Sequence, residues 1–217
     1  LSLDRDPRGL WRAARRTPGF EWLADARLGR YLRSPTLFED AFKVLCTTNT
    51  SWAGTRRMVG RAVERYGVEV GPRRAFPPPE RLAGEREETL RRLLGCGYRA
   101  SGLIELSARA AARPDLWLGD GWRALDAEGL AAKILDVPGL GPASASYLGR
   151  FYGRPREFTV DSWVRRRCAE LFGVHRDVAR FAARRYRAFG DDAPHALWFE
   201  VSRHWHARSF DGGGRWF

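Results

Sequence analysis

Apolar residues recur at helical spacing along almost the whole chain, and this pattern constrains the fold more than any other feature. It predicts helices over residues 37–46, 53–66, 86–94, 100–112, 126–135, 142–152, 161–172, 178–189 and 194–206. The only strand-like stretch is a weak one at Val68–Val70, and no longer repeat is present. The sequence therefore predicts an all-α fold of about ten helices joined by short connections.

Helix boundaries are marked by capping and breaking residues. Ser34 and Pro35 predict the start of the first of these helices, with Ser34 as the cap, and Asp126 is a second predicted cap. Gly95 predicts a helix end. Residues 71–79 finish in three consecutive prolines and are expected to form a loop. The glycine-rich tail from Ser209 is expected to fray.

The chain is strongly basic, with 38 Lys and Arg against 26 Asp and Glu and a net charge of +12. Only Lys43 and Lys133 are lysine, so almost all of this charge is arginine. The surplus favours a polyanionic partner over a neutral small molecule, although a merely basic surface is the alternative. A hydrophobic content of 44% over 217 residues is sufficient for a folded core.

The cysteines argue against a metal cofactor. Cys46, Cys96 and Cys168 are widely spaced and no CxxC motif occurs, so neither a zinc ribbon nor an iron–sulfur cluster is expected. Free thiols fit a reducing cytoplasm. No apolar run is long enough for a membrane span, and the amino end lacks a signal-peptide core. We therefore expect a cytoplasmic monomer, associated with the nucleoid if the cell is prokaryotic.

A short turn separates the helices predicted at residues 126–135 and 142–152, and it reads Val137-Pro138-Gly139-Leu140-Gly141-Pro142. Two glycines around Leu140 allow a tight turn with positive φ, and Leu140 can plug back between the helices. The second helix begins with unpaired N–H groups that suit a phosphate. An ordinary glycine-rich connector is the alternative interpretation.

An aspartate follows this turn at a defined distance. Asp161 lies twenty residues beyond Gly141, within Phe158-Thr159-Val160-Asp161-Ser162-Trp163-Val164-Arg165. An aspartate at a helix start is most often an N-cap. A carboxylate can also stabilise the positive charge that builds on a sugar when its glycosidic bond breaks.

The turn and the aspartate at this spacing resemble the helix-hairpin-helix (HhH-GPD) DNA glycosylase superfamily. The resemblance implies a two-lobed fold with a central cleft: residues 34–150 form one lobe that ends in the hairpin, and residues 1–33 with 151–217 form the other. It also implies that double-stranded DNA with a damaged base is the partner and that Asp161 is catalytic. The implied DNA contacts are Val137, Gly139, Leu140, Gly141, Ala143 and Ser144, with a K⁺ or Na⁺ ion at the carbonyls of Val137 and Leu140.

A lysine that the bifunctional branches of this superfamily use as a nucleophile is missing. There it lies two positions after the second hairpin glycine, and here that position is Ala143. Lys133 precedes the hairpin and does not match. The sequence therefore predicts a monofunctional enzyme that uses water and leaves an abasic site.

Two further segments resemble the 8-oxoguanine glycosylase branch. Cys46-Thr47-Thr48-Asn49 resembles a segment whose Asn fills the space of the flipped base, which gives Asn49 that role. Gly95-Cys96-Gly97-Tyr98-Arg99-Ala100 resembles a segment whose Tyr wedges beside the partner base. Tyr98 is then the wedge, and Arg99 a contact to a phosphate or the partner base. The alternatives are a helix C-cap at Asn49 and a core tyrosine at Tyr98.

This chain lacks the residues with which the 8-oxoguanine branch reads oxidised guanine. That branch has an Arg where this chain has Gly54, a His where it has Trp163, and a Gln near Leu197. An aromatic pocket is expected instead, and it would suit cationic alkylated purines through cation–π stacking, unless the tryptophans are simply core. Its expected members are Trp52, Trp163, Trp198 and Trp205.

Other interpretations remain open on sequence. His195, His204 and His206 lack a fourth metal ligand and are expected at the surface or facing phosphate. The lesion could instead be 8-oxoguanine or a deaminated or mismatched base. A protein of another class, which binds DNA through the hairpin without catalysis, is the last alternative.

Overall fold

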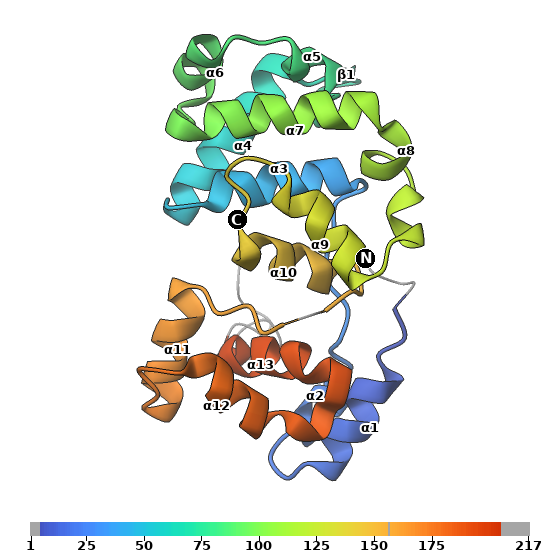
Figure 1. Ribbon diagram of the computed structural model, residues 1–217, viewed down its shortest axis with the longest axis vertical. Helices are drawn as coiled ribbons and strands as arrows, with labels where there is room; N and C mark the ends of the chain where they lie inside the picture. The colour runs from blue at the N-terminus through green and yellow to red at the C-terminus, as the bar shows by residue number, and fades with distance from the viewer. Residues whose placement is uncertain (1–4, 156, 205–217) are drawn as a thin grey trace. The chain divides into compact units, whose positions relative to one another are not determined.

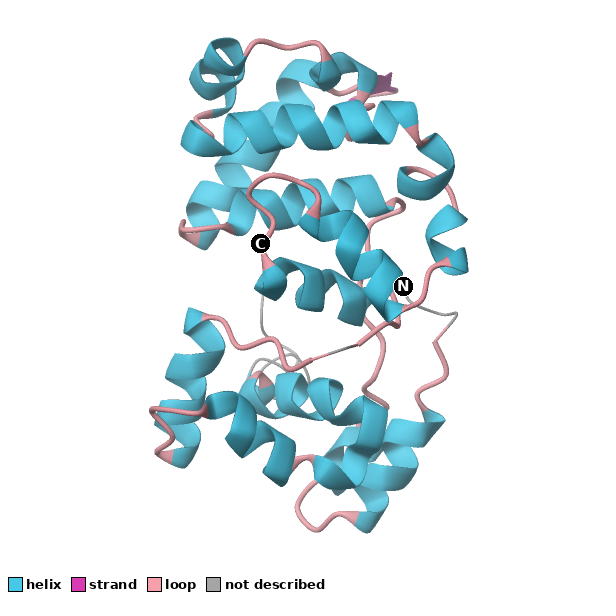
Figure 2. Cartoon of the chain, viewed as in Figure 1, coloured by secondary structure: helices cyan, strands magenta, loops and turns pink. Residues whose placement is uncertain are grey.

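The computed structural model describes residues 5–155 and 157–204. The chain divides into two compact units. We call Arg33–Leu148 the central unit, and Leu1–Leu32 with Gly149–Phe217 the terminal unit. Among the described residues, regular structure is helical apart from one short strand pair (Figure 2). Within this part of the chain, no helix combines the length and the apolar character needed to cross a membrane.

The central unit is built around helix α7, which packs against α3, α5, α6 and α8 (Figure 1). Helix α7 buries Leu103 and Leu106, and α3 buries Phe38, Phe42 and Leu45. The elements are α3 (Leu37–Thr47), α4 (Trp52–Tyr66), β1 (Glu69–Val70), β2 (Arg73–Arg74), α5 (Glu80–Ala83), α6 (Glu87–Leu94), η1 (Gly97–Arg99), α7 (Ala100–Ala112), α8 (Pro114–Trp117), η2 (Gly121–Ala124), α9 (Ala127–Leu135) and α10 (Pro142–Phe151), which continues past the unit boundary.

The terminal unit combines helices from both ends of the chain around one core. Leu10 of α1, Leu23 of α2 and Tyr186 are fully buried in that core, next to Val164 of α11 and Phe199 of α13. The elements are α1 (Arg8–Arg16), α2 (Glu21–Asp25), α11 (Ser162–Phe172), α12 (Val178–Arg185), η3 (Arg187–Asp192) and α13 (Ala193–Val201).

Local signals set most of the helix ends. Asp126 caps α9 by accepting a hydrogen bond from the Gly129 N–H at 2.7 Å, as predicted. Gly95 ends α6 in the left-handed conformation, also as predicted. The first cap was predicted wrongly, because Thr36 rather than Ser34 accepts the Glu39 N–H. Ser34 instead donates its own N–H to the Asp40 carboxylate at 3.0 Å.

Two segments differ from the sequence prediction. The strands β1 and β2 pair antiparallel, where residues 71–79 were expected to be loop throughout. The helix expected over residues 178–189 ends at Arg185 and continues as η3, which contains Gly190 at a φ of 53°. The tail from Ser209 lies outside the described residues.

Candidate nucleic-acid interface and active site

The turn between α9 and α10 is a compact hairpin. The Leu140 N–H donates to the Val137 carbonyl at 3.1 Å, and the Val137 N–H donates to the Ile134 carbonyl at 3.1 Å. Both Val137 and Leu140 are buried, so their side chains fasten the turn to the central unit. Gly102 of α7 makes room for it, because a Cβ there would lie 2.1 Å from the Pro138 carbonyl oxygen.

The two hairpin glycines have different reasons to be glycine. Gly139 has a φ of 88°, which L-residues rarely adopt. Gly141 does not have a positive φ. Of the two glycines around Leu140, only Gly139 therefore adopts the positive φ that the sequence predicted. A Cβ at Gly141 would meet nothing within 4 Å. Nothing in the described protein requires a glycine there, which is consistent with a backbone that a ligand must approach closely.

Helix α10 presents free donors immediately after this glycine. Pro142 has no N–H, and the first backbone bond of the helix runs from the Ala145 N–H to the Gly141 carbonyl at 3.0 Å. The N–H groups of Ala143 and Ser144 have no acceptor in the described part of the chain. Together with the positive end of the helix dipole, these two groups form a site suited to a phosphate.

Asn49 and Tyr98, which are 49 residues apart, are brought together in the central unit. The Asn49 amide Nδ2 donates to the Tyr98 hydroxyl at 3.0 Å. Asn49 has a φ of 44° just beyond the end of α3, and Tyr98 is 55% exposed, so it is not a core tyrosine. Hydrogen bonding with Thr48 and with Asn49 holds the pKa of the Tyr98 phenol below its ordinary value.

Arg99 holds this pair in place, which differs from the DNA contact expected of it. Arg99 is only 8% exposed, and its guanidinium donates to the carbonyls of Thr48, Asn49 and Cys96. It also lies over the Tyr98 ring, 4.6 Å from the centroid. These buried bonds direct its donors into the protein, so Arg99 fixes the loop that carries Asn49.

Asp161 caps helix α11 in the terminal unit. Its Oδ1 accepts the Val164 N–H at 2.7 Å. The residue is exposed, and Oδ2 has no other partner among the described residues. One carboxylate oxygen therefore caps the helix while the other has no partner within the described residues, so a cap and a chemical role are compatible.

Two of the predicted pocket tryptophans form a pair. Trp163 and Trp198 have ring centroids 5.5 Å apart, and both are partly buried against the terminal core. The Arg150 guanidinium lies 4.3 Å from the Trp198 ring. Trp52 belongs to the central unit, where it is 71% exposed. Trp205 lies outside the described residues.

The histidine prediction was wrong for His195. This residue is 1% exposed, and its Nδ1 is hydrogen-bonded to the Tyr31 hydroxyl at 2.7 Å. Burial, together with Arg5 and Arg150, lowers its pKa well below the ordinary value. His204 is partly exposed beside Arg167, and His206 lies outside the described residues.

Sequence reasoning missed some structural supports of these groups. Gly102 leaves a signal, a lone glycine within a helical pattern, but Arg150 and Tyr31 leave none. Leu197, at the place of a base-reading residue in the resemblance, is a buried core side chain. All three cysteines are buried, and burial raises the pKa of each thiol, that of Cys46 to about 12.

Comparison with known proteins identifies the family of the chain. The model of the HhH-GPD superfamily of base excision DNA repair proteins matches residues 42–187, more than half of the chain. The chain therefore belongs to the HhH-GPD superfamily of base excision DNA repair proteins, whose members include DNA glycosylases. No curated protein sequence matches it.

Solved structures share the fold at low identity. The structure of MBOgg1 in complex with a low-affinity DNA ligand has a TM-score of 0.73 at 20% identity, covering 94% of this chain and 72% of that one. A Clostridium acetobutylicum 8-oxoguanine glycosylase/lyase bound to double-stranded DNA has a TM-score of 0.68 at 21% identity, with 94% and 72% covered. The Archaeoglobus fulgidus 3-methyladenine DNA glycosylase has a TM-score of 0.66 at 21% identity, with 91% and 70% covered.

Proposed function

We propose that this protein is a monofunctional DNA glycosylase that removes a damaged base from double-stranded DNA and leaves an abasic site. The observation that carries the proposal is the exposed Ala143 beside the hairpin, where bifunctional relatives would carry a lysine amine. Without that amine, no Schiff base with the sugar forms at this position. Water is then the nucleophile, and Asp161 is the carboxylate available to assist it.

DNA is held through two parts of the central unit. The N–H groups of Ala143 and Ser144 donate to a backbone phosphate, and Gly141 lets that phosphate approach. The Asn49–Tyr98 pair enters the duplex where the damaged nucleotide leaves it. The Asn49 amide offers a donor and an acceptor to the unpaired partner base, and the Tyr98 ring stacks beside it.

Asp161 supplies the chemistry. As the bond between the base and the deoxyribose breaks, its electron pair leaves with the base and positive charge builds on the sugar. The free Oδ2 stabilises that charge and accepts a proton from the attacking water, whose oxygen bonds to the anomeric carbon. The hydrogen bond from the Val164 N–H to Oδ1 holds the carboxylate in position.

The lesion we propose is an alkylated purine. Such bases carry positive charge, leave readily and stack on electron-rich rings, and Trp163 and Trp198 form an aromatic pair in the terminal unit. The two rings lie 5.5 Å apart between centroids, and we assign this pair to the base. The second candidate is 8-oxoguanine, which the Asn49–Tyr98 pair favours because it matches that branch of the superfamily.

The hairpin carbonyls fit a monovalent cation. The Leu140 carbonyl has no donor within the described residues, and the Val137 carbonyl accepts one hydrogen bond, which leaves it a second lone pair. Val137 and Leu140 would hold a K⁺ or Na⁺ ion through these oxygens. When bound, such an ion adds positive charge beside the phosphate site.

A panel of duplexes, each carrying one labelled lesion, tests the proposal. We expect strand cleavage only after alkali, and strongest for alkylated purines. Cleavage without alkali, or covalent trapping by borohydride, would contradict the monofunctional mechanism. Alkali-dependent release of 8-oxoguanine alone would select the second candidate. Binding without release of any base would favour a non-catalytic DNA-binding protein.

A further inference from the structure

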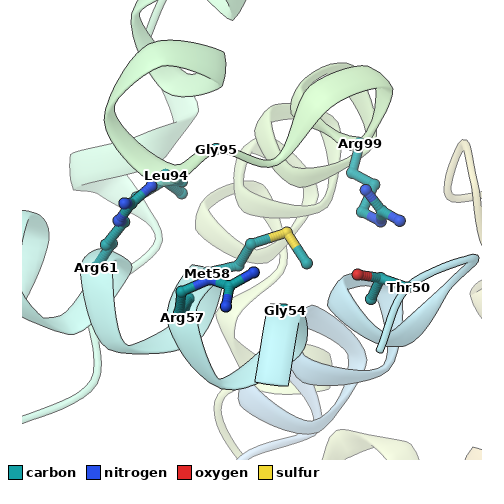
Figure 3. A pocket seen from close by; sticks show the side chains of 8 residues that line it. All are labelled: Thr50, Gly54, Arg57, Met58, Arg61, Leu94, Gly95 and Arg99. Carbon is teal, nitrogen blue, oxygen red and sulfur yellow. The ribbon is translucent and has the colours of Figure 1, made fainter. Parts of the chain in front are cut away.

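Apart from the hairpin, the central unit contains a basic cavity of about 190 Å³ between helix α4 and the end of α6 (Figure 3). Arg57 and Arg61 of α4 line one side of it, and Thr50 and Arg99 line the other. No carboxylate is among its lining residues. A cavity with this lining is suited to an anion.

The positive charges of Arg57 and Arg61 on α4 are not neutralised by any carboxylate of the described residues. Both are exposed, and neither has an ion pair or a hydrogen bond within the described residues. They lie one helical turn apart on the same face, where like charges repel, so a bound anion would stabilise them. Gly95 leaves room for the Arg61 guanidinium, because a Cβ there would lie 2.9 Å from the Arg61 Nη1.

A hydroxyl completes the cavity. The Thr50 Oγ1 has no hydrogen-bond partner in the described part of the chain, and a Cβ on Gly54 would lie 2.4 Å from it. Glycine at position 54 therefore leaves room for this hydroxyl in the lining of the cavity. Two guanidinium groups and one hydroxyl are the donors with which proteins bind phosphate.

The location of the cavity indicates which phosphate it takes. Thr50 directly follows Asn49, and Arg99 directly follows Tyr98, the pair that contacts the undamaged strand in the proposed function. We propose that Arg57, Arg61 and Thr50 bind a backbone phosphate of the strand opposite the lesion. The inference rests on the proposed function only for which strand is bound, and it does not depend on the proposed chemistry of base release.

The first experiment measures how DNA affinity depends on salt. The probe is a duplex with a tetrahydrofuran abasic analogue, which needs no base release. Arg57→Ala/Arg61→Ala should lower affinity about 10- to 100-fold and reduce the slope of log K against log salt by about 1. The matched control is Arg56→Ala/Arg65→Ala, which removes equal charge from α4 outside the cavity. An equal loss in the control would overturn the proposal.

The second experiment identifies the strand. A single neutral methylphosphonate linkage is moved along each strand in turn. In the wild-type protein, one or two positions in the undamaged strand should weaken binding, and the double variant should be insensitive to those same positions. Sensitivity confined to the lesion strand would overturn the assignment.

Inorganic phosphate separates the two sources of the ligand. If it raises the thermal midpoint of the wild-type protein but not of the double variant, and no linkage position matters, the cavity takes free phosphate and the DNA assignment is wrong. Failure of the proposed function is distinguishable, because it would appear as absent base release while these binding measurements keep their expected result.

Discussion

The Gly141→Ala variant tests whether the glycine at position 141 is needed for DNA binding rather than for folding. The added methyl group meets no atom within 4 Å, and the backbone is outside the positive-φ region. The folded state therefore accepts alanine, and the less flexible unfolded chain should raise the free energy of unfolding by about 0.4–1 kcal/mol.

DNA affinity should fall in the same variant. The methyl group lies where a phosphate must approach the N–H groups of Ala143 and Ser144. Each hydrogen bond to a charged group contributes about 1.5–3 kcal/mol, so losing one weakens binding about 10- to 100-fold. Stability and affinity should thus change in opposite directions.

Thermal denaturation and fluorescence anisotropy with an abasic duplex measure the two quantities. Gly84→Ala is the matched control, because its Cβ also meets nothing within 4 Å, and it should leave affinity unchanged. Gly102→Ala should instead cost about 1–3 kcal/mol of stability, since its Cβ collides with the Pro138 carbonyl. Unchanged affinity in Gly141→Ala would refute the assignment of this backbone to a phosphate.

Three further predictions concern other residues. Arg99→Lys should lower the free energy of unfolding by about 2–3 kcal/mol, measured by denaturant titration, because lysine cannot reproduce the planar set of buried donors. Because His195 stays neutral in the folded protein, the free energy of unfolding should have its full value above pH 6.5. It should fall by up to about 1.4 kcal/mol per pH unit as the pH drops below 6.5. A thermal-midpoint series over pH should show this slope in the wild-type protein and lose it in His195→Gln. Ala143→Lys should create borohydride-trappable complexes with damaged DNA, and an absence of trapping would count against the inferred position of the missing nucleophile.

Features determined by neighbouring residues could be predicted from sequence. The bounds of α7 coincide with the predicted helix, and the Asp126 cap and the Gly95 end follow from contacts within one helical turn. The cap at Ser34 failed because its hydroxyl accepts a hydrogen bond from the Lys43 ammonium, nine residues away, while Thr36 caps the helix. That competition depends on the folded arrangement and leaves no mark in the local pattern.

The burial of the polar side chains at the site could not be predicted from the sequence. Arg99 was expected to face DNA because of its place in the motif, yet its partners are the carbonyls of residues about fifty positions earlier. His195 is held by Tyr31, which is 164 positions away. Motif spacing identifies such residues, but only packing shows which way their polar atoms are directed.

The central claim is that Asp161 performs the chemistry, and Asp161→Asn tests it most directly. Asparagine caps a helix as well as aspartate does, so the Val164 bond and the thermal midpoint should be preserved, whereas Asp161→Ala should cost about 1 kcal/mol. We predict that single-turnover base release by Asp161→Asn falls by about 100-fold or more while affinity for an abasic duplex is kept. Release at the wild-type rate by a stable, DNA-binding Asp161→Asn protein would contradict the account.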